Sequence, residues 1–142
     1  MKTFILLSIL VASAFSGAIE LSADDFTNGN VSNGYGQNSG TWFIKFYNPR
    51  CPHWGKFAPV WDKLADEFSQ KENIMFGSLN CSANRQIWGK FNVYAVPTLL
   101  IFKNNKYVEC EYADYDFVSK YLNLHTYDSD LQTQGMPIPA IN

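Results

Sequence analysis

The sequence predicts an α/β fold with a central mixed sheet flanked by helices on both faces. Short apolar or β-branched runs alternate with segments of helical periodicity, a pattern that requires parallel crossovers. Asn104-Asn105 separates two further strand-like runs and predicts a tight turn that adds an antiparallel pair. The chain has 142 residues, of which 46% are hydrophobic, and this is enough for the core of a single domain.

The first 18 residues predict a secretory signal peptide. Lys2 supplies a positive charge, Phe4 to Phe15 is an apolar run, and Ser16-Gly17-Ala18 offers small residues for cleavage. A retained amphipathic helix is the alternative, although no charged face accompanies the apolar run. Cleavage would deliver the chain to an oxidising compartment in which disulfide chemistry is possible.

The first half of the predicted domain begins at residue 19. Ile19 to Leu21 predicts an edge strand, and Ser22 or Asp24 then caps a brief helical turn through Phe26. Residues 27–40 contain four Asn and four Gly, which indicates a surface loop. Thr41 to Tyr47 predicts a buried strand, in which the charge of Lys45 is unusual.

The later elements follow from apolar spacing. In chain order they are a helix from Pro52 to Gln70 containing Pro59, a strand from Ile74 to Leu79, a helix from Ala83 to Phe91, strands from Pro97 to Lys103 and from Lys106 to Tyr112, and a helix from Tyr115 to Leu122. Residues 124–142 lack periodicity, so we expect a C-terminal tail or the start of a linker after a domain that spans residues 19–123.

Cys51 is the candidate nucleophile. It directly follows the predicted buried strand and opens a helix, with Pro52 at the first helical position. The free N–H groups and partial positive charge of a helix N-terminus favour a thiolate over a thiol. His53, as an imidazolium, and Arg50 would add positive charge. A buried, inert cysteine is the alternative, but a junction between strand and helix is a surface position.

Two motifs around this cysteine carry a family resemblance. Residues 43–65 contain a Phe-Tyr-x-Pro-x-Cys sequence, a His before the fourth motif position and Ala58-Pro59, while residues 94–98 read Tyr-Ala-Val-Pro-Thr. The first segment resembles the active-site region of thioredoxin-fold domains in the protein disulfide isomerase family. The second resembles that family's cis-proline loop. The resemblance covers residues 19–123.

The resemblance implies a thioredoxin-like fold and thiol–disulfide exchange on folding proteins of the secretory pathway. Cys51 and His53 would be the catalytic residues, and Val96, Pro97 and Thr98 would contact the substrate. The implied partners are cysteine-containing secretory clients and glutathione as a small-molecule thiol. No cofactor and no metal are expected. The location would be the endoplasmic reticulum lumen or outside the cell, and the last four residues do not match a Lys-Asp-Glu-Leu-type retention signal.

Several positions depart from the family pattern. Trp54 stands where the family has its second, resolving cysteine, so Cys51 has no intramolecular thiol to release a bound substrate. Arg50 stands where Trp is usual, and Lys45 replaces a buried Glu that relays protons. The family's mobile arginine has no counterpart in the short Ala113-Asp114 segment. A redox-inactive peptide-binding or chaperone module is therefore an alternative, and covalent retention of clients by Cys51 is another.

Trp88 raises the same question as Trp54. Some relatives carry two cysteines seven residues apart here; Cys81 matches the first, and Trp88 stands at the second. UGA encodes cysteine in one variant genetic code and tryptophan in others. One hypothesis is that both tryptophans are misdecoded cysteine codons, and genuine substitution is the alternative.

Composition excludes several other functions. A net charge of -2 and an isoelectric point of about 5.6 give no electrostatic basis for binding nucleic acid. After the signal peptide, no apolar run approaches the roughly 20 residues of a membrane span. Cys110 is expected to be a core or edge residue and His125 a surface residue, and no cluster has metal-ligand spacing.

Overall fold

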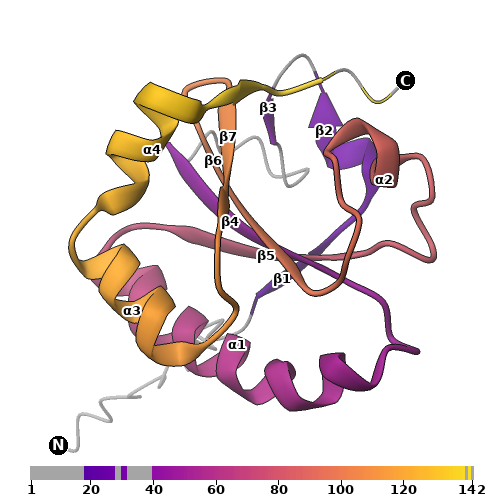
Figure 1. Ribbon diagram of the computed structural model, residues 1–142, viewed down its shortest axis with the longest axis horizontal. Coiled ribbons are helices and arrows are strands. Elements are labelled where there is room, and N and C mark those ends of the chain that lie inside the picture. The colour runs from indigo at the N-terminus through magenta and orange to yellow at the C-terminus, as the bar shows by residue number, and fades with distance from the viewer. Residues whose placement is uncertain (1–17, 28–29, 32–39, 140, 142) are drawn as a thin grey trace, which may run out of the picture.

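The computed structural model describes residues 18–27, 30–31, 40–139 and 141. Its strands and helices are shown in Figure 1 and are, in order, β1 (Ile19–Leu21), β2 (Phe26–Thr27), β3 (Asn30–Val31), β4 (Thr41–Tyr47), α1 (Pro52–Lys71), β5 (Met75–Asn80), α2 (Ile87–Lys90), β6 (Thr98–Lys103), β7 (Lys106–Cys110), α3 (Tyr115–Asn123), α4 (Thr126–Gln134) and β8 (Met136–Pro137). A 3-10 turn follows β1, with Ser22 at its N-cap, as predicted.

The main sheet has the strand order β1-β5-β4-β6-β7-β8. Strands β1, β5 and β4 are parallel, whereas β6, β7 and β8 each run antiparallel to the preceding strand of that order. Asn104 and Asn105 have φ values of 53° and 64°, the left-handed conformation that a two-residue hairpin between β6 and β7 requires. The expected mixed sheet and its tight turn are confirmed.

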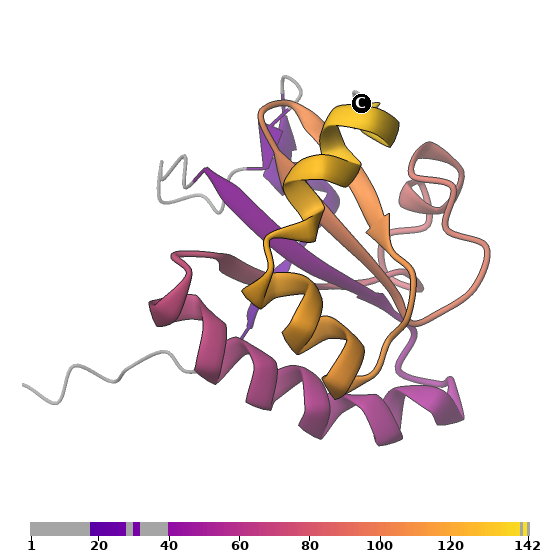
Figure 2. The ribbon, with the colours of Figure 1, turned by 60° about the vertical axis from the view of Figure 1, so that its left-hand side comes forward.

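Helices cover both faces of this sheet (Figure 2). Helices α1, α3 and α4 lie on one face, where the buried side chains of Phe43, Trp61 and Leu122 belong to one apolar cluster. The opposite face carries the 3-10 turn, β3 and α2, which bury Phe26, Phe91 and their neighbours in a second cluster. Each face of the central strand β4 is therefore covered, which explains its continuous apolar sequence.

The predicted tail after residue 123 was wrong. Residues 126–134 form α4, and Met136–Pro137 forms β8 against β7. Tyr127 and Leu131, one helical turn apart, are buried, but the other residues of α4 are mostly polar and exposed. Two apolar positions give almost no helical periodicity, so the helix depends on tertiary packing that a sequence pattern does not reveal.

The predicted helix over residues 83–91 is much shorter than expected. Only Ile87–Lys90 is helical, and turns precede it. The Asn80 side-chain oxygen accepts hydrogen bonds from the Ser82 hydroxyl at 2.7 Å and from the Ser82 backbone N–H at 3.0 Å. This local cap offers the backbone a turn in place of the first helical bonds.

The predicted signal peptide lies outside the described residues apart from Ala18. Within the part of the chain that is described, no helix combines the length and the apolar character needed to cross a bilayer.

Candidate active site

Cys51 sits at the junction between β4 and α1. Its backbone N–H donates to the Asn48 carbonyl at 2.9 Å, and the Arg50 N–H donates to the Asn48 side-chain oxygen at 3.0 Å. This turn leaves Cys51 at the N-cap of α1 with an extended backbone, followed by Pro52. The cysteine is partly exposed and lies at the positive end of a 20-residue helix.

The loop before β6 lies against this sulfur. Antiparallel pairing places Thr98 opposite Phe46, which brings the start of β6 to the end of β4. The peptide bond between Val96 and Pro97 is cis, and the Val96 carbonyl oxygen is 3.8 Å from Cys51 Sγ. Thr98 closes the loop, because its hydroxyl donates to the Ala95 carbonyl. The fold thus brings the predicted substrate-contact loop to the predicted nucleophile.

A groove of about 450 Å³ adjoins the same loop. Pro97 forms part of its wall, and the exposed side chain of His53 lines it from the first turn of α1. The other lining residues come from α1 and from the segment that leads into α3: Lys56, Phe57, Val60, Ala113, Asp114 and Tyr115. Asp114 also caps α3, since its carboxylate accepts the Phe117 N–H at 2.8 Å. Sequence reasoning missed the contribution of α3, which only the tertiary fold brings here.

Two of the three atypical positions, Arg50 and Trp54, adjoin Cys51, and the third, Lys45, lies within β4. Arg50 is exposed in the turn before Cys51. Trp54 is in the first turn of α1, three residues after the N-cap. The N-cap and third helical positions face each other across the start of a helix, so the backbone of residue 54 lies beside Cys51.

Lys45 is buried within β4, with only 4% of its surface exposed. Its ammonium lies 4.9 Å from the centre of the Tyr47 ring and 5.9 Å from that of Trp61. Burial lowers the pKa of Lys45, against the opposing attraction of Asp62 and Glu20. A basic side chain therefore occupies the helix-covered face of β4, where the resemblance leads us to expect an acid.

Glu20 is a further polar residue of this region that sequence reasoning missed. The Tyr47 hydroxyl donates to a Glu20 carboxylate oxygen at 2.7 Å. The strand register aligns Glu20 with Ser78 and Ser78 with Lys45, so the carboxylate and the ammonium share one row of the sheet. The predicted edge strand already contained Glu20, but its register could not be read from the sequence.

Replacing Lys45 with Met is expected to raise the free energy of unfolding near pH 7 by about 1 kcal/mol, because the buried charge is removed. The pKa of Lys45 is lower in the folded than in the unfolded chain, so the unfolded chain binds more protons between the two values. Stability of the natural sequence should then rise with pH in that window, and the variant should lack this rise. Urea unfolding at pH 7 and pH 10 measures both effects. Lys120→Met, at an exposed position of α3, is the control, and equal pH dependence in all three proteins would contradict the prediction.

Cys81 and Trp88 are in contact. The Trp88 ring N–H donates to the Cys81 backbone carbonyl at 2.8 Å, and Cys81 is completely buried. Burial raises the pKa of the Cys81 thiol to about 11. The fold therefore brings positions 81 and 88 together, as a pair of cysteines at this spacing would require. A tryptophan also fits position 88, because its ring N–H has a hydrogen-bond acceptor.

Cys110 is the third thiol and lies at the end of β7. It is 3% exposed and belongs to the cluster on the α1 face, whereas Cys81 belongs to the cluster on the opposite face. Burial, together with the negative charges of Asp114, Asp130 and Glu109, raises the pKa of Cys110 to about 12. Cys110 thus has the surroundings of a core residue, and the sheet separates it from Cys81.

We expect alkylation of the folded chain by iodoacetamide at pH 8 to modify Cys51 alone. Cys81 and Cys110 have pKa values far above pH 8 and are buried, so they present neither a thiolate nor access. Mass spectrometry should find one adduct on the folded chain and three after unfolding in urea. An adduct on Cys81 or Cys110 of the folded chain would contradict this expectation.

Among the described residues, no group of three or more His, Cys, Asp or Glu side chains is placed to hold a metal ion. His125 is exposed and lies at the start of α4, where its ring nitrogen is 2.7 Å from a Glu72 oxygen. It contributes to the packing of α4 and has no place in the Cys51 site.

The fold, the partly exposed cysteine at a helix N-terminus and the cis-proline loop beside it define a domain of the thioredoxin class. The thioredoxin family model matches residues 18–119, and the chain belongs to this family. The first thioredoxin domain of mouse protein disulfide-isomerase A4 superposes with a TM-score of 0.65 at 20% identity, covering 89% of this chain and 84% of that one. The Trx4 domain of ERdj5 gives the same TM-score at 19% identity, covering 79% of this chain and 97% of that one.

The sequence relatives of the chain include protein disulfide isomerases. Mouse protein disulfide-isomerase A6 is 31% identical over 104 residues, which is 73% of this chain and 22% of that protein. Protein disulfide-isomerase like 2-2 of Arabidopsis thaliana is 31% identical over 91 residues, which is 64% of this chain and 19% of that protein. The resemblance to protein disulfide isomerases is confirmed, and the chain spans about a fifth of the length of these two relatives.

Proposed function

We propose that this domain catalyses thiol–disulfide exchange on cysteine-containing proteins of the secretory pathway, with Cys51 as its nucleophile. The observation that carries the proposal is the position of Cys51, a partly exposed residue at the N-cap of α1 whose Sγ is 3.8 Å from the Val96 carbonyl oxygen. Homology to protein disulfide isomerases supports the same chemistry. The predicted signal peptide favours the endoplasmic reticulum lumen or the cell exterior as its location.

The exchange begins when the Cys51 thiolate attacks one sulfur of a client disulfide. A bond forms between Cys51 and that sulfur while the client's own S–S bond breaks, and the displaced client sulfur leaves as a thiolate. A different client thiolate, or glutathione, then attacks the client sulfur bound to Cys51 and expels the Cys51 thiolate. When the displaced thiolate and the attacking thiolate both belong to the client, the client's disulfide moves to a different pair of its cysteines. The client is then neither oxidised nor reduced, and no cofactor is required.

The neighbouring residues have supporting roles in this proposal. His53 lines the groove beside the site, where the resemblance to disulfide isomerases gives it a catalytic role. Val96, Pro97 and Thr98 would hold an extended client segment beside the sulfur, as their place next to Cys51 suggests. The apolar side chains of Phe57 and Val60 give the groove a surface for client side chains.

The proposal is tested by reactivating ribonuclease with scrambled disulfides in a glutathione buffer. The natural sequence should accelerate recovery of ribonuclease activity, and Cys51→Ser should restore the rate of the buffer alone. Circular dichroism verifies that the variant is folded. Ser82→Ala, at an exposed position, is the control and should retain full activity. Equal rates for the natural sequence and Cys51→Ser would refute the proposal.

A redox-inactive peptide-binding or chaperone function is the second candidate, favoured by the tryptophan at position 54. In that case the groove of about 450 Å³ would bind unfolded segments without covalent chemistry. Suppression of the aggregation of a cysteine-free client separates the two, because a chaperone keeps this activity in Cys51→Ser. Accumulation of stable Cys51–client disulfides without release would instead indicate covalent retention.

A further inference from the structure

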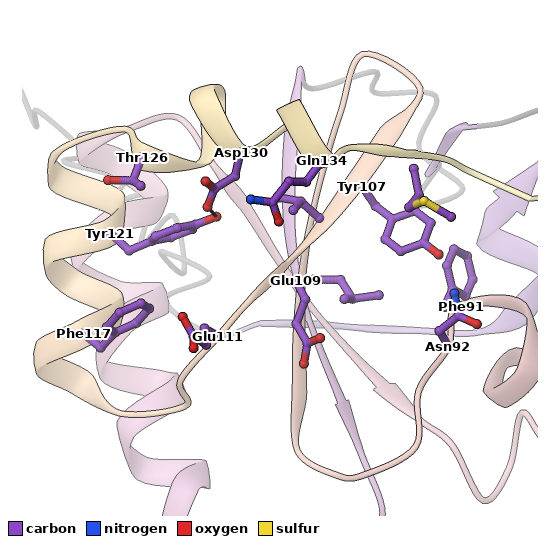
Figure 3. Close-up of a pocket in the computed structure, with 13 residues that line it drawn as sticks. Phe91, Asn92, Tyr107, Glu109, Glu111, Phe117, Tyr121, Thr126, Asp130 and Gln134 are labelled. Atoms are coloured by element: carbon purple, nitrogen blue, oxygen red, sulfur yellow. Dashed lines mark hydrogen bonds between the residues drawn. The ribbon is translucent and has the colours of Figure 1, made fainter. Parts of the chain in front are cut away.

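A second groove of about 660 Å³ lies along the outer edge of β7 (Figure 3). Helix α3 contributes Phe117 and Tyr121 to one wall, and α4 contributes Asp130. On the other side of the strand, the loop after α2 contributes Asn92. None of the residues placed at the Cys51 site lines this groove, and its volume is in the range of about 300–1,000 Å³ typical of binding pockets.

The backbone edge of β7 is open in this groove. Strand β8 lies on the outer side of β7, but its register covers only Lys106 and Tyr107. The two-residue turn makes Lys103 and Lys106 a hydrogen-bonded pair, so the backbone groups of Lys106 face β6. Because this direction alternates along the strand, every second residue from Tyr107 onward directs its N–H and C=O groups away from β6. Glu109 is one of these, and no described strand pairs with its outer side. The groove therefore contains the free donor and acceptor of a sheet edge.

The groove is also negatively charged. Glu109, Glu111 and Asp130 line it, and none of the described lining residues is Lys, Arg or His. The rings of Phe117 and Tyr121 are stacked with their centres 5.9 Å apart. Carboxylates at the rim of a partly apolar groove match the charged head and the aliphatic stem of Lys or Arg side chains, through charge-assisted hydrogen bonds and apolar contacts.

We propose that this edge binds an extended, basic peptide segment of a partner protein, which adds to β7 as a further strand. Backbone bonds to Glu109 would supply the pairing, and Lys or Arg side chains on the face that Glu109 occupies would lie against Glu109 and, beyond the end of β7, Glu111. The site is independent of the thiol chemistry proposed for Cys51, so it would hold a partner whether or not that partner contains cysteine.

The test uses the full chain carrying Cys51→Ser and a fluorescein-labelled peptide of alternating Lys and Val or Thr residues without cysteine. Fluorescence anisotropy at low salt should show saturable binding. A peptide with Glu in place of every Lys, and a Lys peptide with alternate backbone nitrogens methylated, should each bind at least about tenfold more weakly. Failure of the Lys peptide to bind would overturn the proposal. Equal binding of the Glu peptide would exclude the charge recognition, and equal binding of the methylated peptide would exclude strand addition.

Protein variants locate the binding on the molecule. The double variant Glu109→Gln with Glu111→Gln should weaken binding of the Lys peptide about tenfold and reduce its salt dependence. Asp66→Asn removes an exposed carboxylate of α1 away from the groove and should leave the affinity unchanged. Equal affinity of the double variant and the natural sequence would place the peptide elsewhere and overturn the assignment.

Discussion

Replacing Trp54 with cysteine is expected to convert a protein that needs an external thiol to release its clients into one that releases them unaided. Residue 54 is the third helical residue after the N-cap Cys51, so the two residues lie at the same end of α1. A thiol introduced at this position would attack the mixed disulfide intramolecularly, form a disulfide with Cys51 and free the client as a thiol. We expect release at least about tenfold faster than with 1 mM glutathione, because an attached thiol has a high effective concentration.

Insulin reduction with dithiothreitol as the reductant measures this gain. Trp54→Cys should reduce insulin faster than the natural sequence, in which dithiothreitol itself must release each mixed disulfide, and Trp54→Cys combined with Cys51→Ser should lose this gain. Turnover by Trp54→Cys with no chemistry at all in the natural sequence would rule out a monothiol mechanism for the natural sequence.

Reading codons 54 and 88 in the transcript tests the misdecoding hypothesis separately. A UGG codon at either position means a genuine tryptophan there, in a genome that uses UGG for tryptophan.

Truncation after Leu124 is expected to unfold the domain. It removes Tyr127 and Leu131 from the cluster on the α1 face, and Ile138 and Ile141 from the cluster on the other face. Burial of each Leu or Ile side chain contributes about 1.5–3 kcal/mol, so the total loss is comparable to the net stability of about 5–15 kcal/mol of a typical domain. Circular dichroism and tryptophan fluorescence of the truncated chain should show the unfolded spectrum.

Single substitutions in α4 give the graded version of this test. Leu131 is 6% exposed, and Leu131→Ala should lower the free energy of unfolding by about 2–5 kcal/mol. Gln132 is exposed on the same helix, and Gln132→Ala should change it by less than about 0.5 kcal/mol. Equal urea midpoints for the two variants would mean that α4 does not contribute to the folded core.

The sequence predicted well those parts of the molecule that are specified locally. Strand β4 has a continuous apolar run because both of its faces are covered, so its limits were visible without a partner. Cys51 followed by Pro52 marked the start of α1, and the Asn104-Asn105 turn fixed the hairpin of β6 and β7. Recognition of the cis-proline loop came from family resemblance, since residues 94–98 carry little secondary-structure pattern of their own.

What the sequence did not predict depends on contacts between distant residues. Helix α4 has too few apolar residues to show a period, and it is held by packing against α3 and β7. The bond between Tyr47 and Glu20 requires the register of three strands, and Lys45 is explained only when that register is known. The groove on β7 likewise exists only because β8 stops after pairing with two residues.

The pairing of Phe46 with Thr98 determines how the Cys51 site comes apart when the domain unfolds. The two halves of the Cys51 site lie at the ends of β4 and β6, which are hydrogen-bonded neighbours in the middle of the sheet. Hydrogen-bonded strands in the middle of a sheet open with free energies that approach that of global unfolding. The sulfur and its neighbouring loop should therefore separate only when the whole domain opens, so destabilising substitutions far from Cys51 should reduce the number of active molecules and leave the reactivity of each one unchanged.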